Sequence, residues 1–333
     1  MNLCLSVAAV FALSITSVCG AYQQCREDLL EGQVMAVAYS GFRVGQHPDR
    51  GEGAVNPSRA ETLEDLQILT KEGLTLIRLY DSRENSETVL KVIREENLPI
   101  KVLLGIWLDA EISNHAGCSW LTEPIPEEEL ASNKKINEKE VLRGIHLANT
   151  YEDIVIAVNV GNEALVDWND HMVTLEGVIG YVRQVKKGIK QPVTVADNYV
   201  WWTNEGKPLA AELDFIGVHT YPAWEHKSID EALAFTIENI EQVHAALPDS
   251  KIAILEAGWA TTAVEFESTA NEANQKRYYR EIKDWAASTN TTVFFFEAFD
   301  EPWKGDPGNP RGAEKHWGLY FVDRSPKAVM RDE

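Results

Sequence analysis

The sequence lacks several motifs that mark common enzyme classes. It contains no His-Glu-x-x-His motif and no cysteine pair with metal-ligand spacing, so we expect no metal site. No Gly-x-Ser-x-Gly elbow occurs, which argues against a serine hydrolase. No glycine-rich dinucleotide fingerprint follows the first predicted strand, where Tyr39-Ser40-Gly41-Phe42 stands instead, and we expect no cofactor.

Positive charge is scarce as well. The chain has 52 Asp and Glu residues against 31 Lys and Arg residues, and its net charge is −21. Such acidity repels the phosphates of nucleic acids and the headgroups of anionic lipids. We therefore expect no nucleic-acid partner and favour a neutral or cationic one, although plain solubility explains the charge equally well.

Long apolar runs are absent beyond the N-terminus. Residues 1–20 carry no charged side chain, and an apolar run from Leu5 to Ile15 is followed by a small-residue cleavage site at Val18-Cys19-Gly20. This pattern is typical of a signal peptide, although no Lys or Arg precedes the run; a buried N-terminal segment is the alternative. No later stretch approaches about 18 apolar residues, so nothing else is expected to span a membrane. We predict a secreted, extracellular protein (periplasmic if bacterial). Residues 21–333 should form a single domain, and the protein should be a monomer.

Apolar, β-branched runs recur along this domain and alternate with helical patterns, as in parallel βα units. Most of these runs are continuously apolar, which suits strands that are buried on both faces. Because a barrel commonly takes about 250 or more residues, we predict one α/β domain, a (β/α)8 TIM barrel, with an open doubly wound sheet as the rival. The predicted strands are Gln33–Ser40, Leu74–Tyr80, Ile100–Trp107, Ile154–Val160, Pro192–Ala196, Leu213–His219, Lys251–Leu255 and Thr291–Phe296.

Three smaller features depend on this fold. Cys25 and Cys118 could form a disulfide in an oxidising compartment, but Cys25 precedes the first strand and Cys118 follows the third, so they could lie at opposite ends of the barrel. Asn290-Thr291-Thr292 matches a glycosylation acceptor. The loop Leu108–Asn137 is the longest; we expect Trp120 to anchor it as a wall at one end of a cleft, or the loop to lie flat on the outer helices.

Two carboxylates end two predicted strands. The fourth strand runs through Val160-Gly161-Asn162 into Glu163, and the seventh runs through Ile254-Leu255 into Glu256, followed by Trp259. The fourth and seventh strands lie nearly opposite each other in an eight-stranded barrel, so both side chains can face the mouth. Paired carboxylates suit glycoside hydrolysis, in which one protonates the leaving oxygen and the other attacks or activates water. The alternative is that each Glu caps a helix or pairs with an Arg.

Six motifs in order resemble those of glycoside hydrolase family 17, the β-1,3-glucanase family. They extend from about Val37 to Lys327 and comprise Ile77-Arg78-Leu79-Tyr80-Asp81, Val160-Gly161-Asn162-Glu163, His219-Thr220-Tyr221-Pro222, Leu255-Glu256-Ala257-Gly258-Trp259, Phe299-Asp300-Glu301-Pro302-Trp303-Lys304, and Trp317-Gly318-Leu319-Tyr320 with Ser325-Pro326. The resemblance implies a retaining enzyme that cleaves β-1,3-glucan, with Glu163 as acid/base and Glu256 as nucleophile. It also implies that the substrate is bound by Tyr80, Asn162, Tyr221, Trp259, Glu301, Trp303 and Lys304.

Tyr80 and Tyr221 could hold the nucleophile ionised by hydrogen bonding, whereas Glu301 and Lys304 could bind sugar hydroxyls or simply pair with each other. Tryptophans near strand ends could stack on sugar rings or pack in the core, and we favour sugar contact for Trp259 and Trp303. The six tryptophans so placed are Trp107, Trp201, Trp202, Trp224, Trp259 and Trp303.

The sequence departs from the family pattern at Ala260-Thr261, at His219, where Asn is frequent, and at Glu297, where an apolar residue is common. These departures affect substrate details rather than the reaction. Three other functions stay open: a β-1,3-glucanosyltransferase with the same site, a β-glucan-binding barrel with weak catalysis, and a glycosidase of mannan or xylan, against which the second and eighth strand motifs argue.

Overall fold

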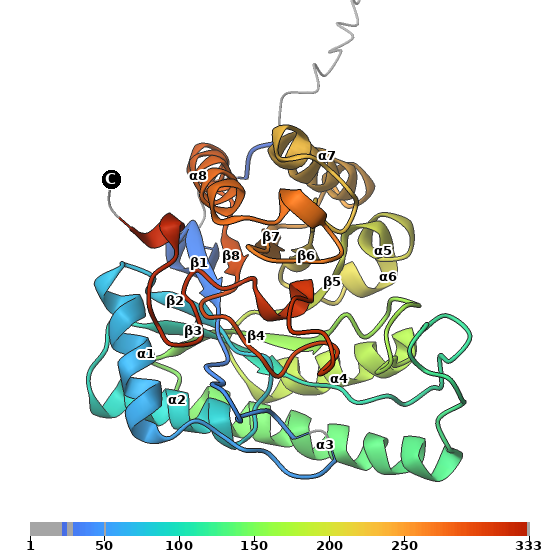
Figure 1. Cartoon of the computed structure of the whole chain (residues 1–333). Coiled ribbons are helices and arrows are strands. Elements are labelled where there is room, and N and C mark those ends of the chain that lie inside the picture. Colours follow the sequence, from blue (N-terminus) through green and yellow to red (C-terminus); the bar gives the residue numbers. More distant parts are fainter. Residues whose placement is uncertain (1–21, 25–28, 50, 332–333) are drawn as a thin grey trace, which may run out of the picture.

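Eight parallel strands close into a barrel in chain order, which confirms the predicted (β/α)8 fold (Figure 1). The computed structural model describes residues 22–24, 29–49 and 51–331. Pairing of β1 with β8, in which Met35 lies opposite Val293, closes the cylinder. The strands are β1 (Met35–Ala38), β2 (Leu76–Arg78), β3 (Lys101–Ile106), β4 (Val155–Asn162), β5 (Val193–Asn198), β6 (Ile216–His219), β7 (Ile252–Gly258) and β8 (Val293–Phe296).

Helices surround the barrel and connect successive strands (Figure 1). Local sequence explains where two of them begin: Ser58 and Glu61 form a capping box at the start of α1, and Ser228 and Glu231 form another at the start of α7. The helices are α1 (Arg59–Lys71), α2 (Glu84–Glu95), α3 (Glu127–Thr150), α4 (Leu175–Gly188), α5 (Tyr199–Asn204), α6 (Lys207–Ala210), α7 (Ile229–Ala246) and α8 (Glu272–Thr289).

The strands are buried on both faces, as their continuous apolar runs predict. Side chains that point into the barrel form one cluster, which includes Leu103, Phe215 and Phe294. Leu29 and Leu30 of the short 3-10 helix η1 (Leu29–Gly32) belong to the same cluster, so this turn packs against the barrel interior. The other face of each strand packs against the helices in a second, larger cluster.

The loop after β3 is shorter than predicted. The loop spans residues 107–126, and α3 begins at Glu127, so the expected boundary at Asn137 is wrong. Glu127, Glu128 and Glu129 form the first helical turn, where negative charge is favoured by the helix dipole, rather than a loop end. Trp120 is 59% exposed and does not anchor the loop.

Polar contacts hold this loop to the segment that follows β4. The backbone N–H groups of Glu111 and Ile112 donate to the carbonyl oxygen of Met172, and the side chain of Asn114 donates to the carbonyl oxygens of Asp167 and Asn169. The loop therefore lies beside the segment that follows β4. It also contacts the outer helices, because Tyr181 of α4 and Asn137 of α3 both donate to Glu111 Oε1. The effect of the loop on the cleavage pattern stays a prediction.

The segment after β8 contains no long helix within the described residues. It holds the short turns η3 (Ala313–Lys315) and η4 (Ala328–Met330), with η2 (Glu267–Thr269) preceding α8. The last of these turns, η4, packs against α8. Side-chain contacts hold this C-terminal segment in place: the buried ammonium of Lys327 donates to Asp300 Oδ1 at 2.6 Å.

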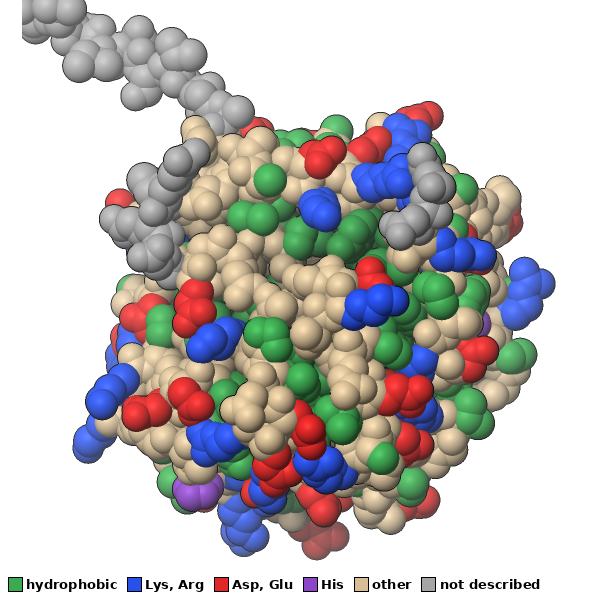
Figure 2. Space-filling view, turned by 90° about the vertical axis from the view of Figure 1, so that its left-hand side faces the viewer, with side chains coloured by type: hydrophobic (Ala, Val, Ile, Leu, Met, Phe, Trp, Pro, Cys, Tyr) green, Lys and Arg blue, Asp and Glu red, His purple; other side chains and the backbone are tan. Residues whose placement is uncertain are grey.

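The surface is mixed in charge on the face that carries α1 and the C-terminal segment. Figure 2 shows acidic and basic side chains interspersed there rather than gathered by sign. Among the described residues, no helix is both long and apolar enough to cross a membrane. Cys118 is buried and forms no disulfide with a described residue, whereas Cys25 and the predicted signal peptide, residues 1–20, lie outside the described residues. Asn290 occupies the left-handed C-cap of α8, and its glycosylation stays a prediction.

Candidate active site

Parallel strands place all their carboxyl ends on one face of the barrel, and the candidate carboxylates meet at this face. Glu256 lies within β7, and Glu163 directly follows β4. The imidazole of His219, the last residue of β6, contacts both: its Nδ1 atom is 2.9 Å from Glu163 Oε1 and 3.5 Å from Glu256 Oε2. The two oxygens are therefore no farther apart than the sum of these distances, about 6.4 Å.

Glu256 is almost fully buried and is surrounded by donors. The Tyr80 hydroxyl donates to its Oε1 atom at 2.9 Å, the Tyr221 hydroxyl donates to its Oε2 atom at 2.6 Å, and Arg78 Nη1 lies 2.9 Å from Oε1. Burial opposes ionisation, but His219, Arg78 and the two hydroxyls outweigh it, so the pKa of Glu256 lies below its ordinary value. This carboxylate is held ionised although it is almost fully buried.

Arg78 connects the carboxylate of Glu256 to the backbone of the barrel. Its guanidinium is fully buried and donates to the Leu255 carbonyl, to Glu256 Oε1 and to Asn162 Oδ1. Asn162 therefore helps to hold the guanidinium that touches Glu256. An arginine in an otherwise apolar strand was the available sequence signal, since a buried charge is retained only with partners.

Glu163 is more open than Glu256, with 23% of its side chain exposed. Its backbone has a φ of 49°, in the left-handed region, and follows Gly161 at 80°. The turn is fixed by three contacts: the Glu163 N–H donates to the Ala196 carbonyl, the Asn169 side chain donates to the Glu163 carbonyl, and the Leu165 N–H donates to Asp197 Oδ2. The irregular turn thus aims this side chain at His219.

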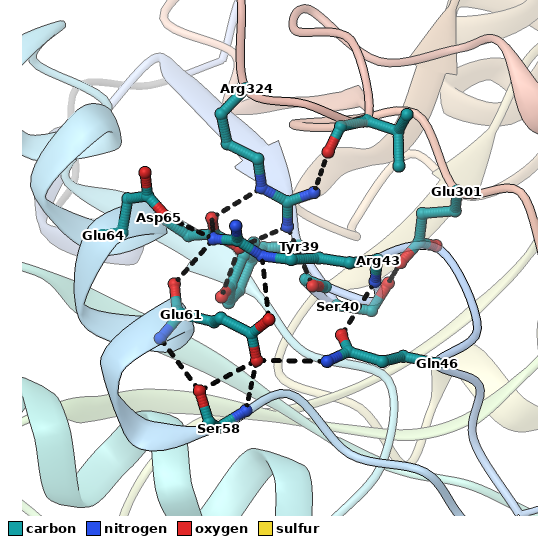
Figure 3. A network of polar contacts seen from close by, with 12 residues as sticks. Tyr39, Ser40, Arg43, Gln46, Ser58, Glu61, Glu64, Asp65, Glu301 and Arg324 are labelled. Atoms are coloured by element: carbon teal, nitrogen blue, oxygen red, sulfur yellow. Dashed lines mark hydrogen bonds and ion pairs between the residues drawn. The ribbon is translucent and has the colours of Figure 1, made fainter.

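A second charged group lies at the end of β8. Lys304 Nζ is 2.5 Å from Glu297 Oε2 and 2.8 Å from Glu301 Oε2. The ion pair between Glu301 and Lys304, which was the alternative to sugar binding, is therefore present, and Glu297 joins it. Burial and the charge of Glu301 outweigh Lys304 and raise the pKa of Glu297, whereas the two carboxylates outweigh burial and raise the pKa of Lys304. The Ser40 hydroxyl donates to Glu301 Oε1 at 2.5 Å (Figure 3).

A buried network behind Ser40 holds the loop that follows β1. Arg324 donates to both oxygens of Asp65 at 2.7 and 2.6 Å, and its Nη2 atom also donates to the Gly41 carbonyl (Figure 3). Tyr39 and Arg43 donate to the same carboxylate. The network ties α1 and the C-terminal segment to the chain on either side of Ser40, and so supports the position of Glu301.

With this geometry in view, sequence comparison decides the family. The model of the BtgE/BtgC glycoside hydrolase domain matches residues 36–318. The chain belongs to this family. The resemblance to glycoside hydrolase family 17 is thereby confirmed, and the chain is a glycoside hydrolase.

Two curated relatives have similar sequences. A protein of Arthroderma benhamiae named "Glucan 1,3-beta-glucosidase" is 26% identical over 310 residues, which cover 88% of this chain and 91% of that protein. An Aspergillus clavatus protein named "Probable glucan endo-1,3-beta-glucosidase btgC" is 25% identical over 302 residues, or 83% of this chain. The match spans only 40% of that Aspergillus protein.

Two solved structures are similar as well. An endo-laminarinase from Formosa superposes with a TM-score of 0.76 at 26% identity, covering 90% of this chain and 86% of that one. A family 17 β-1,3-glucanosyltransferase from Rhizomucor miehei gives 0.67 at 23% identity, with 90% and 97% covered, and shows the shared fold.

The tryptophans of this glycoside hydrolase divide between the core and the active face. Trp259 is 1% exposed and its Nε1 donates to the Thr269 carbonyl, so the prediction that it contacts sugar is wrong. Trp202 is also fully buried. Trp224 is 40% exposed and packs edge-to-face on Phe266, and Trp303 is half-buried.

Three residues of the site were not assigned from the sequence. Arg78 contacts Glu256 and His219 contacts both carboxylates, and each stands in one of the six motifs that resemble the family. Glu314 in η3 lies close enough to matter electrostatically: burial raises its pKa, Lys304 opposes this, and the charges of Glu256 and Glu163 add to the rise. No group of three or more metal-ligating side chains occurs within the described part of the chain.

Proposed function

We propose that this chain is a retaining glycoside hydrolase of β-1,3-glucan, with Glu163 as the acid/base and Glu256 as the nucleophile. The observation that carries the proposal is the meeting of both carboxylates at His219, which limits their facing oxygens to about 6.4 Å. Retaining enzymes place the two carboxyl groups about 5–5.5 Å apart, whereas inverting enzymes need about 6.5–9.5 Å to admit a water. The limit includes the retaining separation.

The different surroundings of the two carboxylates support their roles. Glu256 is buried among donors that favour its ionised form, as a nucleophile requires. Glu163 is more exposed and receives a hydrogen bond from His219 rather than from a charged guanidinium. In the first step Glu163 protonates the glycosidic oxygen while a Glu256 oxygen bonds to the anomeric carbon. In the second, Glu163 takes a proton from water as water displaces Glu256.

The substrate class rests on the relatives. The Arthroderma protein is named for 1,3-glucan and the Formosa structure for laminarin, and both match most of this chain. Neutral sugar polymers also suit a site that offers hydrogen-bonding and aromatic groups, and in which the ammonium of Lys304 is already paired with Glu297 and Glu301. We assign sugar contact to Tyr80, Tyr221, Trp303 and Lys304, and add the exposed ring of Trp224. Glu301 is 1% exposed, and we assign it the role of holding Lys304 rather than a direct contact.

The proposal includes secretion after removal of residues 1–20 and action as a monomer. Transfer of the glycosyl group to a second sugar uses the same two carboxylates, so glucanosyltransfer is a question of acceptor. A product longer than the substrate would reveal it.

The experiment is a time course on reduced laminaripentaose with products resolved by size and by proton NMR. We expect shorter β-1,3-oligomers whose newly released reducing ends are β-anomers in the earliest spectra. Mannan and xylan oligomers serve as controls and should stay intact. An α-anomer appearing first would contradict retention, and an inert pentaose would contradict the substrate.

A further inference from the structure

Two tryptophans project into water from neighbouring segments of the active face. Trp120, in the loop after β3, is 59% exposed, and Trp168, in the segment after β4, is 41% exposed. Burial of an indole ring stabilises a fold, so a ring that stays in water forgoes this gain. A single exposed apolar residue is ordinary, whereas a group of them indicates a binding surface.

Trp168 lies at the tip of a tight turn that the neighbouring loop holds in place. The Asn169 N–H donates to the Val166 carbonyl oxygen and closes the turn around Asp167 and Trp168. The side chain of Asn114, from the loop after β3, donates to the carbonyl oxygens of Asp167 and Asn169, on either side of the ring. Because the backbone beneath Trp168 is already fixed, little of its freedom is lost when the ring binds a ligand.

Trp120 stands on a second turn, which packs against the first. Cys118 is 1% exposed and forms the buried start of this turn, and its carbonyl oxygen accepts from the N–H three residues further along. The two turns touch at Gly117, where a Cβ atom would lie only 2.2 Å from the Asp167 carbonyl oxygen. This contact is three residues from Trp120 and one residue from Trp168. The two rings therefore belong to one surface, which we call the indole patch.

The indole patch is joined to the backbone of the proposed acid/base. The side chain of Asn169, next to Trp168, donates to the Glu163 carbonyl oxygen at 2.9 Å. The same two segments also meet nearer the barrel, because Trp107, directly after β3, packs on His171 with 4.4 Å between the ring centroids. The patch thus continues the active face outward from Glu163, over the ends of β3 and β4.

The position of Glu163 determines which half of a glucan chain points toward the patch. The acid protonates the oxygen of the sugar that leaves, so that sugar lies on the side of Glu163. The charged group around Lys304 follows β8, which lies opposite β4 in the barrel. A chain that crosses the mouth therefore has its leaving half over β4 and its other half toward β8.

We propose that Trp120 and Trp168 form an outer binding site for β-1,3-glucan on the leaving-group side of Glu163. This inference rests on the proposed function. Each indole stacks on the apolar face of a glucose unit beyond the sugar that contacts Glu163. The chain that binds is neutral, because the exposed carboxylate of Asp167 beside the rings repels an anionic polysaccharide.

The test uses enzyme trapped with 2,4-dinitrophenyl 2-deoxy-2-fluoro-β-laminaribioside, because the covalently held sugar then fills the other half of the cleft. Laminaritetraose is left with the leaving-group side, and calorimetry measures its Kd. We expect Trp120→Ala and Trp168→Ala each to raise this Kd by roughly threefold to tenfold, and the double variant to raise it further, because a stacking contact is lost. The control Leu142→Ala removes a side chain of α3 that is 58% exposed and should leave the Kd unchanged.

A second measurement places the patch relative to the cleaved bond. Untrapped enzyme is given laminarihexaose that carries oxygen-18 at its reducing end, and mass spectrometry locates the cut. The double variant should cut nearer the reducing end than the wild type, because fewer glucose units are held beyond Glu163. A shift toward the non-reducing end would put the patch on the other half of the chain and overturn the proposal.

An unchanged tetraose Kd in the double variant would also overturn it. If the rings instead hold a second copy of the chain, sedimentation will show a dimer that the double variant loses while the Kd stays the same, which is equally contrary. Failure of the wild type to form the trapped ester would count against the proposed function instead. The patch is then tested by electrophoresis of the wild type through laminarin gels, where equal retardation of the double variant would refute it.

Discussion

Replacing Tyr221 with phenylalanine removes one hydroxyl from Glu256 and leaves the ring in place. That hydroxyl donates to Glu256 Oε2 at 2.6 Å, and Glu256 is only 6% exposed. A hydrogen bond to a charged group contributes about 1.5–3 kcal/mol. Because about 1.4 kcal/mol corresponds to a factor of ten, kcat/KM should fall roughly 10- to 150-fold if the nucleophile must be ionised.

The pH profile gives the sign of the effect. The pKa of Glu256 is lowered in the folded protein, so the active form is present at neutral pH and is lost as the pH falls through that pKa. Without Tyr221 the pKa of Glu256 rises, by about one to two units at about 1.36 kcal/mol each. The acidic limb of kcat/KM should move to higher pH by that amount.

Tyr278→Phe provides a matched control. This tyrosine is also fully buried, and its hydroxyl contacts Thr236 at 2.7 Å on the outer side of the barrel. The control should lose about 1 kcal/mol of unfolding free energy and keep its kcat/KM and pH profile. If Tyr221→Phe loses less than threefold in kcat/KM and keeps its acidic limb, the argument that donors hold Glu256 ionised is refuted.

Three further changes test other parts of the account. Asp65→Asn leaves the buried guanidinium of Arg324 without its carboxylate partner, and urea unfolding should show a loss of about 3–5 kcal/mol. Arg183→Ala, which breaks an exposed pair with Glu212, should change nothing measurable. Trp224→Ala should raise KM for laminari-oligosaccharides without a change in melting temperature; an unchanged KM would remove this ring from the site. Trp259→Ala should do the reverse, losing about 3–5 kcal/mol of stability at unchanged KM, because its ring lies in the core.

Much of the site follows from local sequence because strand ends carry it. The motifs ending in Glu163 and Glu256 could be placed on opposite sides of the mouth once eight strands were counted. Side-chain direction, which alternates along a strand, was not applied to Trp259. Glu256 points into the mouth, and Trp259, three residues later, lies on the other face, where it packs against Tyr278 of α8.

Other features depend on how distant strands close. The contact of Arg78 with Glu256 joins β2 to β7, and no spacing in the sequence reports that distance. The same holds for His219, which contacts Glu163 at the end of β4 and Glu256 in β7. The start of α3 could have been predicted from the sequence, because the three acidic residues after Pro126 are typical of the first turn of a helix.

The central claim is that Glu256 forms a covalent bond to the sugar. The most direct measurement is incubation with 2,4-dinitrophenyl 2-deoxy-2-fluoro-β-laminaribioside, followed by peptide mass spectrometry. The fluorine slows hydrolysis of the glycosyl-enzyme, so the account predicts a single fluorolaminaribiosyl label on Glu256 and, in Glu163→Ala, the same label with slow turnover. A label on another residue, or fast release of dinitrophenolate by active enzyme with no labelled peptide, would contradict it.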